Sequence, residues 1–432
     1  MVKKTKKQIE RNEQLYELIT LVAGTFSLQD VLEKLAQAAV RIAGPAVTAC
    51  SIRLLDEDAG ELKMRSTYGL SEEYRNKGVV SKNDTVIEAA FAGDAVVLDD
   101  MRVDGRVKYP QAAKKEGLVS QLTVAMQFRK KPIGVLRLYS PKPKHFDKDD
   151  IGLARAVASQ CAVAITNARL YAQAIEGSRI AEQMRLAGIV QRRMIPQKAP
   201  VVKQLDLAAT YIPCFDVGGD LYDFFEIDED RIVVIIADVI GKGIPAAIMM
   251  SLFKGAVRAY AHLAKSKKGL SKIIDKLNKM ACTECKDGEF VSLFYAVIDT
   301  VQKKVTYCNC GHEPTVLIRD GQVKDLDKGG LVLGVEKDTD YEIETLGLKK
   351  DDCLLFYTDG LIDAANFEGK LWGREKMLEA AKKFIDNTAD LMVKNILGYR
   401  RRFVGLARQI DDTSIVVAKI GKTLADNNKK SP

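Results

Sequence analysis

The sequence lacks the features that would place it in several common classes of protein. It has no run of about 18 consecutive apolar residues, so no transmembrane helix is expected. Its polar, basic first residues lead into no apolar stretch, so no secretory signal is expected. No basic stripe is interleaved with aromatic residues, which argues against nucleic-acid binding. We therefore expect a cytoplasmic protein with no membrane insertion and no nucleic-acid partner.

Cysteine is also scarce, with 8 residues in 432, and no disulfide scaffold is expected in a chain without an export signal. The pairs Cys282/Cys285 and Cys308/Cys310 have spacings that a zinc site can use. We favour the alternative that Cys308 and Cys310 are buried on one strand face, because free cysteine behaves as a small apolar residue. The chain also lacks a Ser-His-Asp pattern and a cysteine in a Gly-rich phosphate loop, so no side-chain nucleophile is indicated.

What is present is typical of a globular protein. Hydrophobic residues make up 47% and charged residues 29% of the chain, and 432 residues are enough for two or three domains. Much of the net charge of +8 lies in lysines near the two ends, which we interpret as solvated tails.

The first half predicts an α+β domain. Residues 7–25 have the spacing of an amphipathic helix, and Ser27 is placed to cap a second one. A short helix is expected at 85–91, and a long helix begins after residue 150. Between the helices, the pattern predicts antiparallel strands at 47–55, 61–66, 95–98, 119–128 and 133–140.

Residues 25–172 resemble a GAF domain. The resemblance is carried by Gly134-Val135-Leu136-Arg137-Leu138, by Phe146-Asp147 and by the segment from Gln160 to Tyr171. It implies a sensory module, since some GAF domains bind cyclic nucleotides, haem or bilins. The sequence does not select among ligands. An unknown small ligand and a dimerisation module without a ligand both stay open.

The pattern of residues in the long helix after residue 150 predicts that its last part links the first half of the chain to the second. Mainly apolar residues, interrupted by Gln191, recur with the four-three spacing of a short coiled coil, and Ile195-Pro196 ends the helix. We favour a parallel two-stranded linker in a homodimer, able to transmit a change from sensor to effector, over a helix packed on its own domain. The seam consists of Ile180, Met184, Ala187, Gln191 and Met194. The predicted parts are an N-terminal helix (1–25), the GAF-like domain (26–172), the linker (173–198), a second domain (199–420) and a basic tail (421–432).

In the second domain, acids recur at the ends of apolar strands. Asp238 ends the run 231–236, and Asp359 follows the strand 353–358. Asp220 follows two glycines, where the backbone can turn tightly, and Asp411-Asp412 precedes the strand 413–418. Clustered carboxylates without cations would repel one another, so a meeting of these acids implies a hard metal ion held through oxygen. The alternative is four unrelated surface acids that cap strands and turns.

Many strands with helices in blocks suggest stacked sheets with helices outside. We expect strands at 291–299, 305–309, 315–319, 322–326, 341–345 and 353–358, and helices at 245–263, 270–280, 375–385 and 389–403.

Five motifs in order resemble the metal-dependent (PPM-type) protein phosphatases, in their bacterial sporulation and stress-response branch. They are residues 217–223, 237–247, 310–314, 357–361 and 411–414. The resemblance implies a β-sandwich flanked by helices, two Mn²⁺ or Mg²⁺ ions at one end, and hydrolysis of phosphoserine or phosphothreonine. It further implies a phosphorylated protein substrate, such as an antagonist of an anti-sigma factor, and regulation by the GAF-like domain through the linker.

Carried over by position, Asp220 and Asp238 either bridge the two ions or bind the first of them, with the Val239 carbonyl as a candidate for a further ligand. Asp359 and Asp411 complete the second site, with Asp411 preferred to its neighbour Asp412. A pair of such ions lowers the pKa of a shared water and so replaces a side-chain nucleophile.

Three further residues keep two interpretations each. Asp223 could contact a metal ion indirectly, through water. His312 is either a general acid or a structural hydrogen-bonding residue. Lys242 either contacts the phosphate or is a solvated lysine.

Two other functions compete with the phosphatase. One is a phosphatase-like scaffold that binds a partner without hydrolysis. The other is a nucleotidyl cyclase, suggested by Gly218-Gly219-Asp220, but it leaves Asp359 and Asp411 without a role.

Overall fold

The computed structural model describes residues 27–286 and 288–421. The predicted helix at 7–25 and the basic tail beyond residue 421 lie outside them. The chain divides into two compact units between Ile180 and Ala181. Among the described helices, none combines the length and the hydropathy needed to cross a bilayer.

The first unit is built on one antiparallel sheet of five strands in the order β2-β1-β5-β4-β3. All five predicted strands are present, and most of their ends lie one or two residues from the predicted positions. Their bounds are β1 (Ala49–Asp56), β2 (Glu61–Tyr68), β3 (Val96–Leu98), β4 (Ser120–Phe128) and β5 (Lys131–Ser140). The helices are α2 (Leu28–Ala43), α3 (Glu72–Arg75), α4 (Thr85–Phe91), α5 (Pro110–Lys115) and the first part of α6 (Lys148–Met194).

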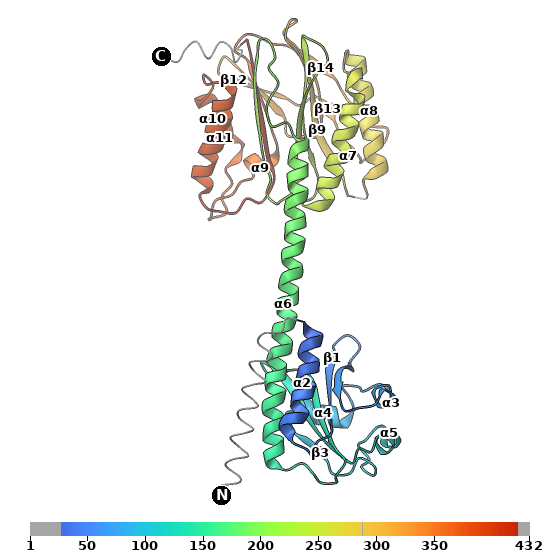
Figure 1. Ribbon diagram of the computed structural model, residues 1–432. Helices are drawn as coiled ribbons and strands as arrows, with labels where there is room; N and C mark the ends of the chain where they lie inside the picture. The colour runs from blue at the N-terminus through green and yellow to red at the C-terminus, as the bar shows by residue number, and fades with distance from the viewer. Residues whose placement is uncertain (1–26, 287, 422–432) are drawn as a thin grey trace. The chain divides into compact units, whose positions relative to one another are not determined.

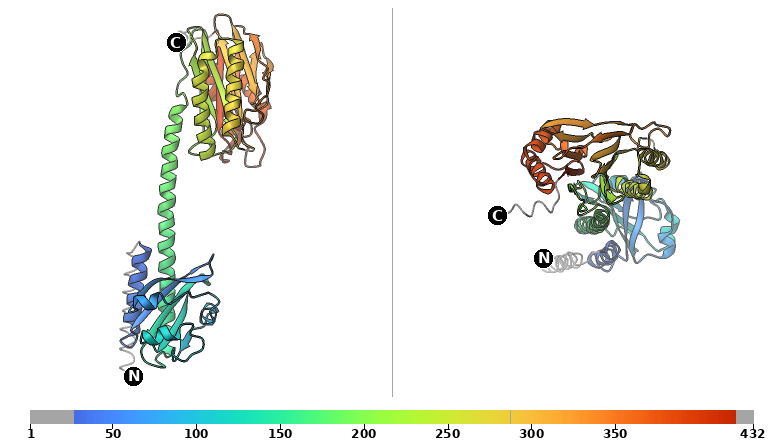
Figure 2. Two further views of the ribbon diagram at one scale, coloured as in Figure 1. Left: turned by 90° about the vertical axis from the view of Figure 1, so that its right-hand side faces the viewer. Right: turned by 90° about the horizontal axis from the view of Figure 1, so that it is seen from above.

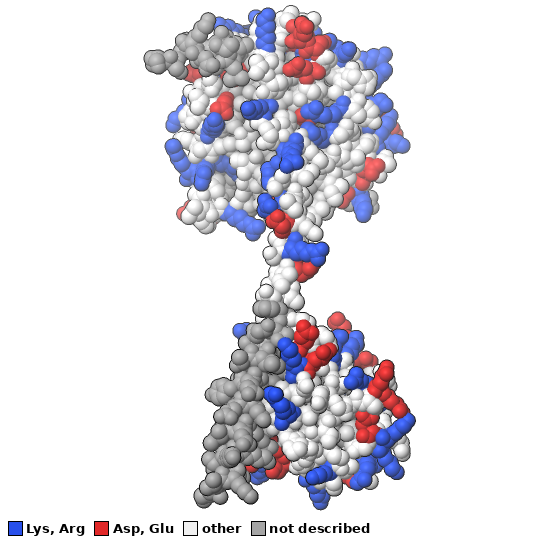
Figure 3. Space-filling view, viewed as in Figure 1, with Lys and Arg blue, Asp and Glu red and all other residues white. Residues whose placement is uncertain are grey.

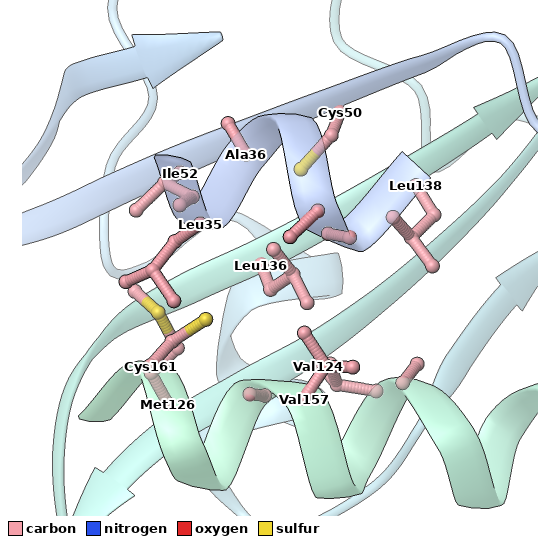
Figure 4. Close-up of a cluster of buried hydrophobic side chains, with 14 of the residues drawn as sticks. Leu35, Ala36, Cys50, Ile52, Val124, Met126, Leu136, Leu138, Val157 and Cys161 are labelled. Carbon is pink, nitrogen blue, oxygen red and sulfur yellow. The ribbon is translucent and has the colours of Figure 1, made fainter. Parts of the chain in front are cut away.

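The two faces of this sheet are covered differently. Apolar residues of α2 and α6 pack on one face, where Leu35 and Val157 meet Ile52 and Leu136 (Figure 4). The other face lies under α3, α4, α5 and their loops, with Tyr74 and Ile87 in its apolar part. Ser27 caps α2 as predicted, because its hydroxyl accepts a hydrogen bond from the Asp30 N–H.

The second unit is a sandwich of two mainly antiparallel sheets, as the pattern of strands and helical blocks predicts. One sheet has the order β13-β10-β9-β8-β7, with β14 paired to β10, and the other has the order β12-β11-β15-β16-β6. The strands of the first sheet are β7 (Leu221–Glu226), β8 (Arg231–Val239), β9 (Val291–Asp299), β10 (Lys304–Cys310), β13 (Gly329–Gly330) and β14 (Glu344–Gly347). Those of the second are β6 (Leu205–Ile212), β11 (Thr315–Arg319), β12 (Gln322–Leu326), β15 (Cys353–Tyr357) and β16 (Thr413–Ile420).

Helices cover both outer faces of the sandwich. One sheet packs against α7 (Ile244–Tyr260) and α8 (Lys267–Glu284), and the other against α10 (Gly373–Lys383) and α11 (Ala389–Val404). These two pairs lie on opposite sides of the strands in Figure 1, and Figure 2 shows α7 and α8 lying across one sheet. A third apolar layer, which includes Phe294 and Phe356, fills the space between the sheets. The short helix α9 (Asp359–Ile362) continues from β15.

Some details of the second unit differ from the expectation and others agree with it. The strand expected at 341–345 lies at Glu344–Gly347. The bounds of β9 and β10, which pair with each other, agree closely with the prediction. The strands β6, β7 and β13 were not predicted. The first two mix polar and apolar residues, whereas β8 is a continuous apolar run, and β13 has only two residues. Cys308 and Cys310 are fully buried on β10 with their sulfurs 3.8 Å apart, which confirms the buried-strand interpretation.

Charged side chains are distributed over both units. On the face shown in Figure 3, Lys and Arg are scattered among acidic and uncharged residues.

Candidate metal centre

The four predicted acids come to the same end of the sandwich. Asp220 immediately precedes β7, and Asp238 lies near the end of the antiparallel neighbour β8. Asp359 follows β15, and Asp411 precedes its antiparallel neighbour β16. Antiparallel strands place the start of one beside the end of the next, so each sheet contributes two acids to this end.

Asp220 joins the two sheets. Its side chain is 1% exposed, and its Oδ2 accepts hydrogen bonds from the hydroxyls of Thr358 (2.7 Å) and Ser414 (2.8 Å). Thr358 in turn accepts from the Ser414 N–H at 2.9 Å. Hydroxyls from the ends of β15 and β16 therefore hold a carboxylate from the opposite sheet in a fixed orientation.

The electrostatics of the four acids show that they crowd one another. Burial, followed by the negative charges of Asp359 and Asp411, raises the pKa of Asp238 to about 7, although a hydrogen bond with Asp220 acts in the opposite direction. Burial, followed by the charge of Asp238, also raises the pKa of Asp220 well above its usual range. The pKa of Asp359 is raised by burial and then by Asp411. Burial and crowding of like charges therefore both disfavour the ionised form of these carboxylates.

Asp411 and Asp412 have different environments. Both oxygens of the buried Asp412 carboxylate accept backbone hydrogen bonds, from Cys214 N (2.8 Å) and Gly219 N (2.7 Å). Asp412 thus fixes the Gly218-Gly219 turn that leads into Asp220. The half-buried Asp411 carboxylate instead forms an ion pair with Lys242 at 2.7 Å. Both Asp412 oxygens are thus taken up by backbone donors, whereas Asp411 is more exposed, and this difference makes Asp411 the better candidate of the two for a metal ligand.

Two glycines allow the elements of the site to approach closely. A Cβ on Gly219 would lie 2.7 Å from the Val239 carbonyl oxygen, and one on Gly360 would lie 1.8 Å from the Asp412 carbonyl oxygen. A side chain at either position would push the backbone of the site apart. The Val239 carbonyl therefore lies against the turn that carries Asp220, where it was predicted as a ligand.

Lys242 lies at the rim of the site. Its side chain is 43% exposed, and besides pairing with Asp411 it donates to the Ile410 carbonyl. The lysine is therefore the neighbour of a predicted ligand and is not simply solvated.

His312 has a structural role in this arrangement. The buried ring accepts from or donates to Ser292 Oγ through Nδ1 at 2.7 Å and contacts the Tyr357 carbonyl through Nε2 at 3.2 Å. Burial lowers the pKa of His312 to about 4. Both ring nitrogens are occupied, so His312 ties β9 to the end of β15 and thereby supports Thr358 and Asp359.

Asp223 is not part of the metal centre. Its fully buried carboxylate binds Lys254 and Arg258 of α7, each at 2.6 Å. The outer-partner prediction for Asp223 is therefore wrong, because the side chain faces α7 and is fully used there.

The structure adds a residue that the sequence placed elsewhere. Gln191, near the end of α6, donates from its amide to the Gly218 carbonyl (2.7 Å) and accepts from the Gly218 N–H (3.0 Å). It is 5% exposed, and a Cβ on Gly188 would lie 2.1 Å from the Asp216 carbonyl oxygen. Gln191 therefore belongs to the turn before Asp220 and not to a coiled-coil seam. Its polar side chain at a seam position was the one feature of the sequence that could have indicated this different role.

The donor set suits a hard cation, but its side chains are not arranged around one. Among residues 27–286 and 288–421, no group of three or more His, Cys, Asp or Glu side chains is placed to hold a metal ion as it stands. The chemistry still fits, since Asp220 and Asp238 are buried together and the only ion pair of the four acids among these residues is that of Asp411 with Lys242.

Comparisons with known proteins agree with both halves of the chain. A family model described as "Stage II sporulation protein E (SpoIIE)" matches residues 228–421, and a GAF-domain model matches residues 26–166. The phosphoserine phosphatase RsbU of Bacillus subtilis is 31% identical over 244 residues, which cover 56% of this chain and 71% of RsbU. The phosphoserine phosphatase RsbP of the same organism is 27% identical over 42% of this chain and 45% of its own length.

One solved structure supports the fold of the second unit. The SiaA-PP2C domain of Pseudomonas aeruginosa superimposes with a TM-score of 0.51 at 18% identity, over 57% of this chain and 98% of that domain. Fold, site and sequence together define a protein phosphatase of the PP2C class. The chain belongs to the family of RsbU-like serine/threonine phosphatases with a SpoIIE-type catalytic domain, and it carries a GAF domain before that domain.

Proposed function

We propose that this protein removes phosphate from phosphoserine or phosphothreonine on a signalling protein, with two Mn²⁺ or Mg²⁺ ions as cofactors. The observation that carries the proposal is the meeting of Asp220 with Asp238, where the charges of Asp359 and Asp411 also act on Asp238. A cluster of this kind is costly without cations and useful with them.

The residues at this end of the sandwich divide the work. Asp220, Asp238 and the Val239 carbonyl would hold one ion, and Asp359 and Asp411 the other. When bound, such ions lower the pKa of a water and offset the charge of a phosphoryl group. Thr358 and Ser414 orient Asp220, Asp412 fixes the turn before it, and Lys242 keeps a positive charge at the rim.

A protein substrate is supported by the surface beside the site. Ile240 lies two residues after Asp238 and is 39% exposed, and the outward side of α7 continues with Ile244, Ile248 and Leu252, all exposed. An apolar row of this kind suits contact with another protein. We propose that the substrate is a phosphorylated antagonist of an anti-sigma factor or a similar small switch protein.

We also infer that the GAF domain regulates the phosphatase through α6, in a homodimer. Two observations support this inference. The helix α6 is continuous from Lys148 to Met194, and its last turns hold the turn before Asp220 through Gln191. Ile180, Leu186 and Val190 are exposed on the same helix, which leaves apolar surface for a second copy.

The proposed activity is tested by Asp238→Asn in the full-length chain. We expect Mn²⁺-dependent hydrolysis of p-nitrophenyl phosphate and of a phosphoserine protein to fall at least 100-fold, because the carboxylate shared by the acid cluster is lost. Asp275→Asn is the matched control, since Asp275 forms only an exposed pair with Lys279 on α8.

Circular dichroism would show that both variants fold. Activity retained in Asp238→Asn would exclude the assigned site. Wild-type protein that binds Mn²⁺ without any turnover would favour the scaffold function instead.

A further inference from the structure

The end of the sandwich that carries the four acids also exposes large apolar side chains. Phe215, in the loop from β6 to β7, is 47% exposed, and Ile410, one residue before Asp411, is 52% exposed. Ile240, which follows β8 directly, is exposed as well. We call Phe215, Ile240 and Ile410 the rim patch. Single exposed apolar residues are common on proteins, but several at one place indicate an interaction site.

The loops that carry the rim patch contact one another. Lys242, in the loop after β8, forms an ion pair with Asp411 at 2.7 Å and also donates to the Ile410 carbonyl. Arg408 lies over the Phe215 ring, with its guanidinium carbon 5.8 Å from the ring centre. The loop before β16 therefore contacts both of the other loops, and the three apolar residues belong to one surface.

Hydrogen bonds fix the backbone beneath this surface. The Cys214 N–H donates to the carboxylate of the buried Asp412 at 2.8 Å, which holds the loop from β6 to β7. The side-chain amide of Gln409 donates to the carbonyls of Ile212 (2.9 Å) and Asp411 (2.6 Å), which ties the loop before β16 to the end of β6. Loops that are already ordered lose less conformational entropy when a partner binds, so the rim patch is prepared for a contact.

The position of the rim patch determines what can cover it. Each of its residues stands within five positions of one of the four acids in the sequence. A protein that presents a phosphoserine to these acids must therefore lie over the loops that carry them. A small phosphate ester has no side chains to place there. The occupant of the rim patch is thus the substrate protein itself, in the segment around its phosphoserine.

The composition of the rim patch favours apolar residues in that segment. Aromatic and arginine side chains supply much of the binding energy in protein interfaces, and the Phe215 ring with Arg408 over it provides both. An apolar side chain buried against Phe215 or Ile410 gains from leaving water. A polar side chain in the same place would lose its water and find only apolar atoms.

We propose that the rim patch binds the residues next to the phosphoserine of the substrate protein, and that these residues are apolar. The inference rests on the proposed phosphatase activity and gives that site a sequence specificity. Burial of one apolar side chain against the rim patch should raise kcat/KM on the order of 10-fold.

The test uses the full-length protein with Mn²⁺ and three substrates. Two are phosphoserine peptides that differ only in the two residues on each side of the phosphoserine. These residues are leucine in one peptide and asparagine, which has nearly the same shape, in the other. The third substrate is p-nitrophenyl phosphate, which has no residues to place on the rim patch. We expect kcat/KM for the leucine peptide to exceed that for the asparagine peptide by about 10-fold or more.

Phe215→Ser and Ile410→Ser are the test variants, and Val301→Ser is their control. Val301 is also an exposed apolar residue, but it lies in the turn from β9 to β10 at the opposite end of the sandwich. We expect each test variant to reduce the preference for the leucine peptide by about 3- to 10-fold, because one apolar contact is lost. Hydrolysis of p-nitrophenyl phosphate should stay unchanged in all three variants, and Val301→Ser should keep the peptide preference.

Three results would overturn the proposal. They are equal rates of the wild-type protein on the two peptides, a preference kept in both test variants, and a preference lost equally in Val301→Ser. If circular dichroism shows that one test variant fails to fold, the other decides. Wild-type protein that hydrolyses none of the three substrates with Mn²⁺ would instead refute the proposed function, and this inference with it.

Discussion

Replacement of Gln191 gives the sharpest prediction about how the linker helix acts on the metal centre. Gln191 contacts no acid of the site, yet it makes two buried hydrogen bonds to Gly218, two residues before Asp220. Gln191→Leu keeps the bulk of the side chain and removes both bonds. The Gly218 N–H and carbonyl then lose their partners.

The magnitude follows from these two groups. Each buried backbone group left without a partner costs about 1–3 kcal/mol. Part of this cost falls on the turn that positions Asp220, and metal binding must then reorder that turn. Since about 1.4 kcal/mol corresponds to a tenfold change in an equilibrium constant, we expect Mn²⁺ to bind about 10- to 100-fold more weakly.

The assay separates positioning from chemistry. Mn²⁺ affinity is measured by calorimetric titration, and phosphatase rates are measured over a series of Mn²⁺ concentrations. We expect saturating Mn²⁺ to restore most of kcat in Gln191→Leu, because all four acids are intact. Gln183→Leu is the matched control, since Gln183 is an exposed glutamine of the same helix.

Two results would refute this reasoning. Unchanged Mn²⁺ affinity in Gln191→Leu would show that the last turns of α6 do not control the Asp220 turn. A loss of kcat that saturating Mn²⁺ does not restore would assign Gln191 to the chemistry or to the fold instead. Regulation through α6 would then lose its main structural support.

Two further predictions concern protonation. The folded-state pKa of Asp238, about 7, lies above the ordinary value of about 3.9. The free energy of unfolding of the metal-free protein, measured by denaturant unfolding, should therefore fall as the pH rises from about 4 to 7. Over the same range the Mn²⁺ affinity, measured by calorimetry, should rise, because the competing proton leaves. Asp238→Asn should flatten both slopes. His312, with its pKa lowered to about 4, stays neutral from pH 5 to 8. His312→Asn should thus lower the free energy of unfolding by about 2 kcal/mol, because buried hydrogen bonds are lost. The shape of the pH–rate profile between pH 6 and 8 should stay unchanged. A displaced profile would instead identify His312 as a general acid.

The sequence predicted the fold well where one pattern dominated a segment. The run 232–236 is apolar throughout and forms the middle of β8. Ser27 caps α2 because a short polar side chain can accept the Asp30 N–H there. The strands β6 and β7 escaped prediction. Both mix polar and apolar residues, and their place is set by pairing with β16 and β8.

The sequence predicted which acids are candidate metal ligands, but not which residues form hydrogen bonds with them. The positions of Asp220, Asp238, Asp359 and Asp411 at strand ends, with the order of the motifs, named the candidate ligands. Sequence spacing did not separate Asp411 from Asp412, since adjacent residues carry the same acid. The two acids differ in their hydrogen bonds, since Asp412 accepts from Cys214 and Gly219, and both donors lie about 200 residues away along the chain.

By itself, the sequence determined the local properties of this protein: which segments are helix or strand in most places, and which acids stand at strand ends. These depend on side-chain periodicity and turn residues within a few positions. Only the tertiary structure decided the partners of buried polar groups, including Gln191 on Gly218 and Asp223 on α7. Burial turns each such partner, or its absence, into a large free energy, and the partners come from distant parts of the chain.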